Sequence, residues 1–552
     1  MKKKSAKIRT IRQIRVPFLA HVCLTLALWI LLIYTALNIK ISYDESLSFY
    51  ALKTNDWRKL IGLANTHWLN SLWMKITMLV SGDNLFAMRI LSLAAFPLYA
   101  TGVFRIAQTF KNQRFALAIY ALLLLNPYSL QFFALARGYG LAMAIQAWLI
   151  YELLVASSEW RVASWYRIGH LCLLMMLANF SYLYTVFGVF AIFLLHIILR
   201  KKDYTWNKDT FKITLYFTLI ILGTTANLMI YRHTGDLWFG GQHFIESVFT
   251  SVWLRYIYYL STETLPQILS YLTLGIIAII TTYFAIDFFR KKEINAGVGL
   301  SIIILAMLVL TLFFHLAFDT PYLFKRTALQ WWIPAFVLFF IWLKKITNPS
   351  SDISKMSDDS TSELAFSSPQ PPPKGEKDLG SFSPKGKILT QDEQPSPPLE
   401  KNPASFSPPL EGAGGWTGKA FFSITASIFL LANFIFQYKN NYHARIEKQR
   451  YDEIIYNDLL ELNPSKVGMS SHFTIQLQHY YQYKNPQFTT LNYAPIREKK
   501  LTDCENGTAW NDLTQFDYII ASESETIDCL REKNIEFELV KTYGKHRLVH
   551  LK

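Results

Sequence analysis

The chain has 552 residues, of which 51% are hydrophobic and 15% aromatic, while only 17% are charged. A soluble protein of this length would not be so apolar, so the composition indicates a polytopic membrane protein. The net charge of +15 would suit a nucleic-acid-binding protein, but the basic residues form short runs between apolar segments, as the positive-inside rule predicts. They form no stripe with interleaved aromatics, so membrane lipids are expected as partners and nucleic acid is not.

The chain begins with a basic segment, MKKKSAKIRTIRQIR (1–15), and an apolar run over 16–39 follows it. This run is too long for the apolar core of a signal peptide and has no small-residue cleavage site, so we interpret it as a retained first span. The basic start is expected to stay in the cytoplasm, which places the residues after the span on the outer face.

Two adjacent carboxylates, Asp44 and Glu45, follow the first span at the expected outer surface of the membrane. One interpretation is a solvated pair that caps the helix SLSFYALK, because acidic residues favour helix N-termini. The other is a functional site, which depends on the polar residues found later in the chain.

A short amphipathic helix is predicted in the loop 41–84, and it carries His67 and Asn70. Its tryptophans would rest at the membrane interface, where aromatic rings settle. A lone histidine there is more often a surface residue than a ligand. Beside two carboxylates at the same depth, a shared polar site is the alternative, and it could hold a divalent ion.

The segment NPYSLQFFALARGYGLAMA places Arg137 inside an apolar stretch near the outer end of a span. Burying a guanidinium at the centre of a membrane costs about 2.5–3.5 kcal/mol on the scale from membrane-insertion experiments, which gives the lowest values. Arg137 should therefore have an anionic partner. That partner is either an internal carboxylate or a phosphate. Tyr139 is the nearest hydroxyl, with an aromatic-belt residue as its alternative interpretation.

Further apolar runs continue the membrane domain to residue 346 and add one last span at 420–438. The run 168–199 is ambiguous: one tilted span would put RKK (200–202) outside, and two short spans that turn near 180–184 would put it inside. The charge rule favours two, which gives about eleven spans. The other runs cover 85–104, 115–127, 134–155, 211–230, 266–288, 296–318 and 329–343.

A basic pair, Lys325 and Arg326, falls on a predicted outer loop with Asp319 as the one obvious local acid. Such pairs are disfavoured outside under the positive-inside bias. Bidentate recognition of a phosphate by the arginine, with the lysine as a point charge, would justify the exception. Charges tolerated near a late span are the alternative.

Two regions differ from the membrane domain in composition. Residues 347–419 are polar and rich in Pro, Ser and Gly, which predicts a disordered cytoplasmic linker. Residues 439–552 alternate strand-like segments (466–469, 488–493, 516–522, 537–552) with helix-like ones (473–484, 525–533), which predicts a small extracytoplasmic α/β domain. It lacks a Gly-rich phosphate loop, so we expect no nucleotide role. Spacing leaves open whether its Cys504 and Cys529 form a disulfide.

Acids that can activate a nucleophile and cations that can bind a phosphate, all on the outer face, suggest a lipid-phosphate donor. The order of YDESLSFY, NTHWLNSLWMK, NPYSLQFFALARGYG and YLFKRTALQWWIP resembles the GT-C superfamily of membrane glycosyltransferases, within it the family 39 and ArnT-like branch. The resemblance covers 15–343 and implies a GT-C-like catalytic domain over 16–346. It also implies a polyprenyl-phosphate sugar donor, an inverting transfer and a lipid, glycan or protein acceptor.

The resemblance further implies roles for individual residues. The acid pair after the first span would hold the catalytic base, Asp44, with Glu45 beside it. The family's second motif often reads His-Pro-Pro, and THWLNS keeps His67 without the prolines. The family's AR-x-Y element matches 136–139, and its late arginine before a proline-containing span matches Arg326.

The predicted reaction is displacement at the anomeric carbon of the sugar, with Asp44 as general base. Cations would stabilise the leaving phosphate: Arg137, Lys325 and Arg326. Substrate contacts are assigned to His67, Asn70 and Tyr139. No cofactor is assigned, and a divalent metal is left open.

A transporter or lipid flippase is the alternative function. It predicts charged residues near the bilayer midplane and matching halves, whereas here the polar groups gather at the outer ends and the halves do not match. A non-catalytic scaffold is a third interpretation. If the chain is a glycosyltransferase, we expect it in a bacterial inner membrane, with the site and the C-terminal domain on the periplasmic side. The sugar, the acceptor and the oligomeric state are left open.

Overall fold

The computed structural model describes two parts of the chain, a helical bundle and a C-terminal sheet region. The described residues are 2–55, 67–110, 112–157, 160–199, 208–234, 241, 243–253, 264–318, 320–323, 325–347, 454–455, 457–459, 461–462, 466–470, 492–496, 516–521, 527, 530–531, 534–543 and 546–552. The predicted linker after 347, the last predicted span, Asp319, Cys504 and Cys529 lie outside them.

The bundle contains eight helices that are long and apolar enough to span a membrane, counted over the described residues. This confirms a polytopic helical membrane fold. They belong to α1 (Lys2–Asn38), α5 (Leu85–Gln108), α8 (Gly138–Ala156), α10 (Leu183–Leu199), α11 (Lys208–Thr234), α13 (Thr264–Lys291), α14 (Ala296–Phe318) and α15 (Trp332–Thr347). α6 (Gln113–Leu124) and the segment Pro127–Ala134 form a further bent pair, at 47°.

The ambiguous run 168–199 forms two helices. α9 (Val162–Ala178) ends before a short 3₁₀ turn, η2 (Phe180–Tyr182), and α10 follows it directly. Asn179 begins the turn, because its side-chain oxygen accepts hydrogen bonds from the backbone N–H and the hydroxyl of Ser181 at 2.9 and 2.8 Å. The predicted turn near 180–184 is therefore confirmed.

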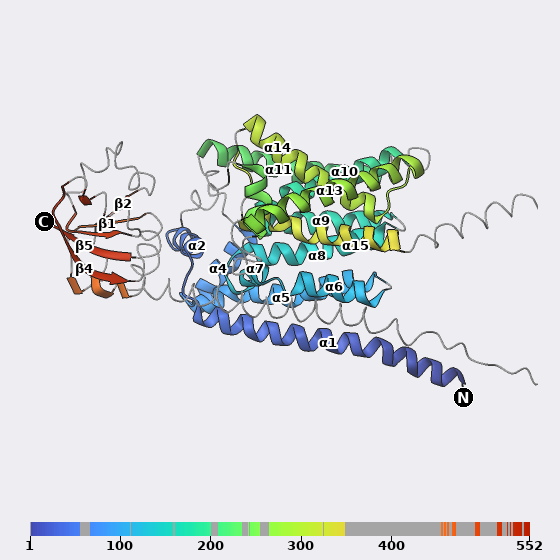
Figure 1. Ribbon diagram of the computed structural model, residues 1–552, viewed down its shortest axis with the longest axis horizontal. Helices are drawn as coiled ribbons and strands as arrows, with labels where there is room; N and C mark the ends of the chain where they lie inside the picture. Colours follow the sequence, from blue (N-terminus) through green and yellow to red (C-terminus); the bar gives the residue numbers. More distant parts are fainter. Residues whose placement is uncertain are drawn as a thin grey trace, which may run out of the picture. The chain divides into compact units, whose positions relative to one another are not determined.

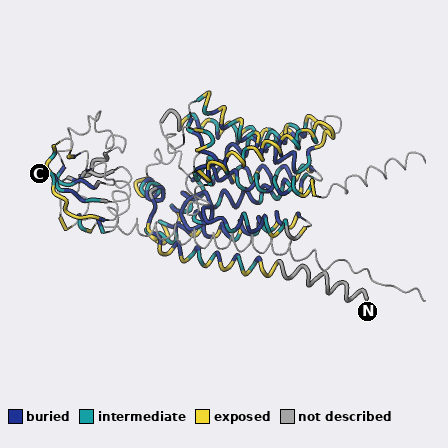
Figure 2. Tube along the Cα trace, viewed as in Figure 1, coloured by how far each residue is buried: buried dark blue, intermediate teal, exposed yellow. Residues whose placement is uncertain are grey.

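The spans differ in how far the rest of the bundle encloses them. α8 is central, with 67% of its apolar window buried, and it packs mainly on α5 and α9. α13 is peripheral, with 22% buried, and its outer side chains are exposed (Figure 2). α10 packs closely on α14 because Gly188 lacks a side chain: a Cβ there would lie 2.7 Å from the Cα of Ile303.

Short elements gather at one end of the bundle, opposite the N-terminal end of α1 (Figure 1). They are α2 (Tyr43–Lys53), α4 (Trp68–Ser81), α7 (Pro127–Leu130) and η1 (Gln131–Ala134). α4 is amphipathic, as predicted, but it turns polar residues such as Asn70 inward and leaves Leu79 and Val80 exposed. Two further short elements, η3 (Glu246–Thr250) and the 3₁₀ helix η4 (Lys325–Trp331), precede α13 and α15 in the chain, and η4 packs against η3 and α8.

The C-terminal region contains a five-stranded mixed sheet of order β2-β1-β3-β5-β4, which confirms the predicted small strand-bearing domain. The strands are β1 (Lys466–Ser470), β2 (Asn492–Ile496), β3 (Tyr518–Ala521), β4 (Phe537–Tyr543) and β5 (His546–Leu551). β1 pairs in parallel with β2 and β3, whereas β5 is antiparallel to β3 and β4. β2 begins later than the predicted strand at 488–493, and the predicted helix 473–484 lies outside the described residues.

Candidate functional site

The acid pair is buried, with 4% of Asp44 and none of Glu45 exposed. The solvated-pair interpretation is therefore wrong. Both residues lie in the first turn of α2, and Glu45 caps that helix by accepting a hydrogen bond from the backbone N–H of Ser42 at 2.7 Å. Because adjacent residues on a helix point about 100° apart, the two carboxylates meet different partners.

Glu45 forms a fully buried ion pair with Arg89 of α5. The Nε of Arg89 lies 2.9 Å from one carboxylate oxygen, and Nη2 lies 2.9 Å from the other. The backbone N–H groups of Ala136 and Ser42 donate to the same two oxygens at 2.6 and 2.7 Å. Burial alone would raise the pKa of Glu45, but the charge and hydrogen bonds of Arg89, with these backbone bonds, lower it to about 2.

Arg89 also forms hydrogen bonds with backbone carbonyl groups at the C-terminal end of α1. Its guanidinium donates to the carbonyl oxygens of Ala36, Ile39 and Lys40 at 2.8, 2.6 and 2.9 Å, so it satisfies carbonyls at the C-terminal end of the helix. All its neighbours are thus fixed groups of the protein. Glu45, predicted beside the catalytic base, is instead held as the partner of Arg89, and we do not place it among the reacting groups.

Asp44 faces two other guanidiniums, from the N-cap of α8 and from η4. Its Oδ2 lies 2.8 Å from Nη2 of Arg137 and 3.2 Å from Nη2 of Arg326. The anionic partner expected for Arg137 is therefore an internal carboxylate. The side chain of Arg326 is 21% exposed, whereas those of Asp44 and Arg137 are 4% and 6% exposed. Arg326 thus forms the accessible side of the site.

The chain reaches this geometry through Gly138, the residue after Arg137. A Cβ at Gly138 would lie 1.7 Å from the carbonyl oxygen of Ala178 and 2.9 Å from Cβ of His67. Only glycine lets the start of α8 approach the end of α9 this closely. Arg137 itself has extended backbone angles and donates from Nη2 to the hydroxyl of Ser42 at 3.2 Å.

Tyr139 and His67 line the same site. The hydroxyl of Tyr139 accepts a hydrogen bond from Nε of Arg326 at 3.2 Å, and its ring meets the His67 ring edge-on at 4.9 Å. His67 is 4% exposed, and within the described residues neither ring nitrogen has a partner at hydrogen-bond geometry. Burial, with the charges of Arg137 and Arg326, lowers the pKa of His67 to about 3 against the opposing effects of Asp44 and the Ala178 carbonyl. The imidazole is therefore neutral at physiological pH.

Asn70 and Lys325 lie at the margins of this group. The side-chain oxygen of Asn70 is 3.3 Å from the hydroxyl of Ser92, which is also 3.2 Å from the backbone carbonyl of Arg137. Ser92 has one hydroxyl hydrogen for these two acceptors, so Asn70 lies beside the Arg137 backbone and is not bonded to it. Lys325 is half-buried and has a left-handed backbone with φ of 52°, and its backbone N–H donates to the hydroxyl of Ser251 at 2.9 Å.

The charges do not cancel. Among the described residues, two carboxylates, Asp44 and Glu45, pair with three guanidiniums, which leaves one positive charge in this group with His67 neutral. Over the part of the chain that the structure describes, no three side chains of the His, Cys, Asp and Glu types lie close enough together to hold a metal ion. An excess of cation and a ring of hydrogen-bond donors favour an anionic ligand.

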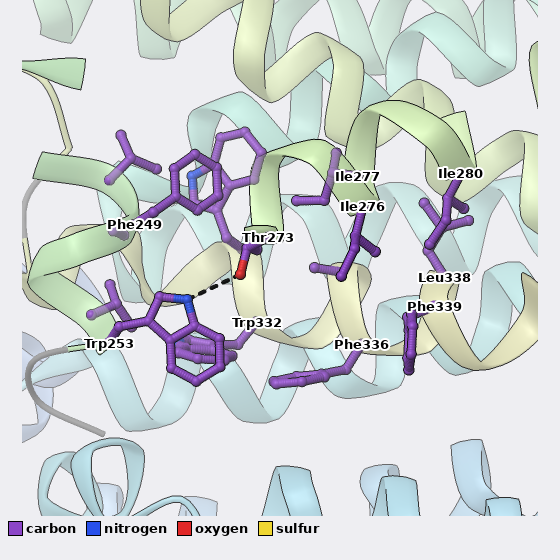
Figure 3. Close-up of a pocket in the computed structure, with 15 residues that line it drawn as sticks. Phe249, Trp253, Thr273, Ile276, Ile277, Ile280, Trp332, Phe336, Leu338 and Phe339 are labelled. Atoms are coloured by element: carbon purple, nitrogen blue, oxygen red, sulfur yellow. Dashed lines mark hydrogen bonds between the residues drawn. The ribbon is translucent and has the colours of Figure 1, made fainter. Parts of the chain in front are cut away.

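An apolar cavity of about 180 Å³ lies between the η3 segment, α13 and α15 (Figure 3). Its walls are aromatic and aliphatic, and its visible polar contact joins the indole N–H of Trp253 to the hydroxyl of Thr273 at 3.1 Å. η4 connects it to the ion-pair site, since Arg326 and the lining residues Ala328 and Trp331 belong to that one helix. This cavity was not predicted from the sequence, because apolar residues in spans carry no signal for a gap.

The structure thus brings five predicted residues into one group: Asp44, Arg137, Arg326, Tyr139 and His67. Asn70 joins it indirectly, and Lys325 is the chain neighbour of Arg326. Sequence reasoning missed Arg89, although the signal was present, since a guanidinium inside the apolar run 85–104 requires an anionic partner just as Arg137 does.

No protein-family model matches the chain, and no curated protein matches it. Two solved structures of ArnT from Cupriavidus metallidurans are similar to it. The structure bound to undecaprenyl phosphate has 11% sequence identity and a TM-score of 0.48, with 96% of this chain and 97% of that chain covered. The apo structure has 10% identity and a TM-score of 0.47, with the same coverage.

Proposed function

We propose that this protein is a glycosyltransferase that moves a sugar from a polyprenyl-phosphate donor to an acceptor at the membrane surface. The observation that carries the proposal is the buried Asp44 carboxylate, shared by the guanidiniums of Arg137 and Arg326. It joins a candidate base to candidate phosphate ligands at one point. The sequence resemblance to GT-C enzymes supports the same assignment.

The charge of the site suits this donor. A polyprenyl-phosphate sugar carries one negative charge on its phosphodiester, which equals the one positive charge that the paired groups leave over. The phosphate would compete with Asp44 for the two guanidiniums, because charge-assisted bonds from arginine to phosphate are as favourable as those to carboxylate. Once they turn to the phosphate, Oδ2 of Asp44 can accept a proton. Lys325 would add a further charge beside Arg326.

The reaction then balances as follows. The acceptor oxygen or nitrogen bonds to the anomeric carbon, and its proton goes to Asp44. The bond from the anomeric carbon to the phosphate oxygen breaks, and polyprenyl phosphate leaves with one more negative charge than the donor had. Arg137 and Arg326 stabilise that added charge in a buried site, where electrostatic interactions are strongest. Neutral His67 and the hydroxyl of Tyr139 are placed to contact the sugar.

The apolar cavity gives the donor chain a place beside the phosphate ligands. Its walls are apolar side chains that can pack against an isoprenoid chain, such as Ile276, Ile277 and Phe336. The peripheral helix α13 forms one side of the cavity. A lipid that entered there would meet η4, which carries Arg326. We place the site on the periplasmic side of a bacterial inner membrane, since the basic N-terminus lies at the opposite end of the bundle.

The test is a transfer assay with the purified full chain in vesicles and undecaprenyl-phosphate sugars as donors. Arg326→Lys should raise the donor KM at least about tenfold, since lysine keeps the charge but loses the bidentate fork. Arg290→Lys, at an exposed position of α13, is the matched control and should change nothing. Mass spectrometry of surface glycolipids and glycoproteins from cells that lack the chain would identify the acceptor.

Two results would contradict this function. If intact donor crosses the bilayer and no sugar leaves its phosphate, the chain is a flippase. If Arg326→Lys uses the donor as well as the wild type does, the phosphate site is wrong.

A further inference from the structure

η4 is an unusual way to begin a span. It is a 3₁₀ helix over Lys325–Trp331, and even without its left-handed first residue it is longer than the about four residues beyond which such runs are uncommon, because their hydrogen-bond geometry is poorer. An α-helix over the same residues would form better hydrogen bonds. Something outside the segment must hold it in this form.

A buried polar network supplies that hold. Gln330 is fully buried, and its side-chain N–H group donates to the backbone carbonyl of Ser181 in η2 at 2.6 Å. Its side-chain oxygen accepts from the hydroxyl of Thr185 in α10 at 3.1 Å. Its backbone carbonyl accepts from Nε2 of Gln146 in α8 at 2.8 Å. η4 is thus tied to three neighbouring elements, and Gln146 and Thr185 are also fully buried.

The helix type decides where Arg326 lies. A 3₁₀ helix rises about 2.0 Å per residue and an α-helix about 1.5 Å, so over the six steps to Trp332 the 3₁₀ form carries Arg326 roughly 3 Å further out. It also turns about 120° per residue in place of 100°, which rotates Arg326 by roughly 120° over the same steps. As an α-helix, η4 would withdraw Arg326 from both Asp44 and Tyr139, which it now contacts at 3.2 Å each.

We infer that Gln330, with Gln146 and Thr185, is a positioning residue that holds η4 in its 3₁₀ form and so sets Arg326 at the donor phosphate. The inference rests on the proposed function for its catalytic consequence. Its structural part stands apart from it. No residue of this network touches the reacting atoms, and each acts through η4.

The first experiment measures the position of η4 without any reaction. Spin labels are placed at Thr327→Cys in η4 and Val80→Cys in exposed α4, in a full chain whose four native cysteines are replaced. Pulsed electron paramagnetic resonance in vesicles should show a distance distribution that shifts by about 3 Å or broadens in Gln330→Leu. An unchanged distribution would overturn the inference, whether or not the chain proves to be a glycosyltransferase.

The second experiment compares two buried threonines. Thr185→Val loses the bond to Gln330, whereas Thr311→Val loses a bond to the carbonyl of Met307 in its own helix. Thr185→Val should shift the label distance in the same direction as Gln330→Leu, and Thr311→Val should leave it unchanged. Equal shifts from both would reduce the network to general packing and overturn the inference.

A double-mutant cycle then tests the catalytic consequence. Gln330→Leu alone should lower donor turnover about 10- to 100-fold, since misplacement by an ångström costs up to about 100-fold. On an Arg326→Lys background it should add almost nothing, because it acts through Arg326. Full additivity with an active wild type would refute the positioning role while leaving the proposed function intact. An inactive wild type would refute the function, and the label distances would still decide the position of η4.

Discussion

At the scale of single residues, Asp44 and Glu45 show how neighbours in sequence acquire different chemistry. Glu45 is surrounded by fixed donors, namely Arg89 and two backbone N–H groups. Asp44 meets two guanidiniums, of which that of Arg326 is partly exposed and can turn to a ligand. Burial and hydrogen bonding thus separate a structural carboxylate from one that can react.

Asp44→Asn should lower transfer about 10²- to 10⁴-fold, because the amide keeps the shape and loses the proton-accepting oxygen. Because the amide leaves the buried guanidiniums without their carboxylate, the unfolding midpoint should also fall, so rates are expressed per folded protein, measured by immunoblot and thermal unfolding. Rates are measured with saturating donor, so that a change in donor affinity does not imitate a loss of base. A well-folded, fully active variant would exclude Asp44 as the base.

Glu45→Gln should change stability and its pH dependence. The pKa of Glu45 is lowered from an ordinary 4.5 to about 2 in the folded chain. At pH values above 4.5 the ionised carboxylate therefore stabilises the fold by about 3 kcal/mol. This stabilisation is lost as pH falls from about 4.5 toward 2, because the folded chain resists protonation. Unfolding midpoints in detergent over pH 3 to 7 should therefore fall less steeply for Glu45→Gln, from a lower starting value. Parallel curves would contradict the buried pair.

His67 also makes the folded chain less stable as pH falls, but over a different pH range. Its pKa is lowered from 6.5 to about 3, so the unfolded chain binds a proton between these values that the folded chain does not. Stability is therefore full above about pH 6.5 and declines below it. His67→Gln should remove this earlier part of the decline and leave the part below about pH 4.5, which the same unfolding series can resolve.

At the scale of helices and turns, close approach depends on small residues. At Gly138 an added Cβ would lie 1.7 Å from a backbone oxygen of α9, so Gly138→Ala must displace α8 or α9. We expect a cost of about 1–3 kcal/mol in unfolding free energy and a loss of transfer, since Arg137 is the preceding residue. Gly275→Ala, where nothing lies within 4 Å, is the control and should be neutral or slightly stabilising. Similar midpoints for both variants would contradict the close contact.

The helices could be predicted because each span has its own apolar run, and even the turn near 180–184 followed from charge placement. The turns that build the site could not. η4 is a 3₁₀ helix because of Ser181, Thr185 and Gln146, which lie far from it in the chain. The pairing of Glu45 with Arg89 likewise spans 44 residues. The periodic pattern of apolar residues in a sequence shows which side chains are buried, but not which distant side chains form contacts with one another.

At the scale of the whole molecule, the chain folds two regions of different composition, a helical bundle and a mixed sheet. The bundle positions every residue of the proposed site, and all of them lie within the sequence resemblance to GT-C enzymes. Among the residues that the structure describes, the sheet region contributes none of them.

Sidedness connects the site to its substrates. α2 and α4 lie at the end of the bundle opposite the basic start of α1, so if that start is cytoplasmic the site faces outside (Figure 1). A cysteine at the exposed Thr54 should then react with an impermeant thiol reagent in intact cells, in a chain whose native cysteines are replaced. A cysteine at Ser381 in the predicted linker should react only after the membrane is opened. Labelling of Ser381→Cys from outside would reverse the orientation and place the site, with its donor, on the cytoplasmic face.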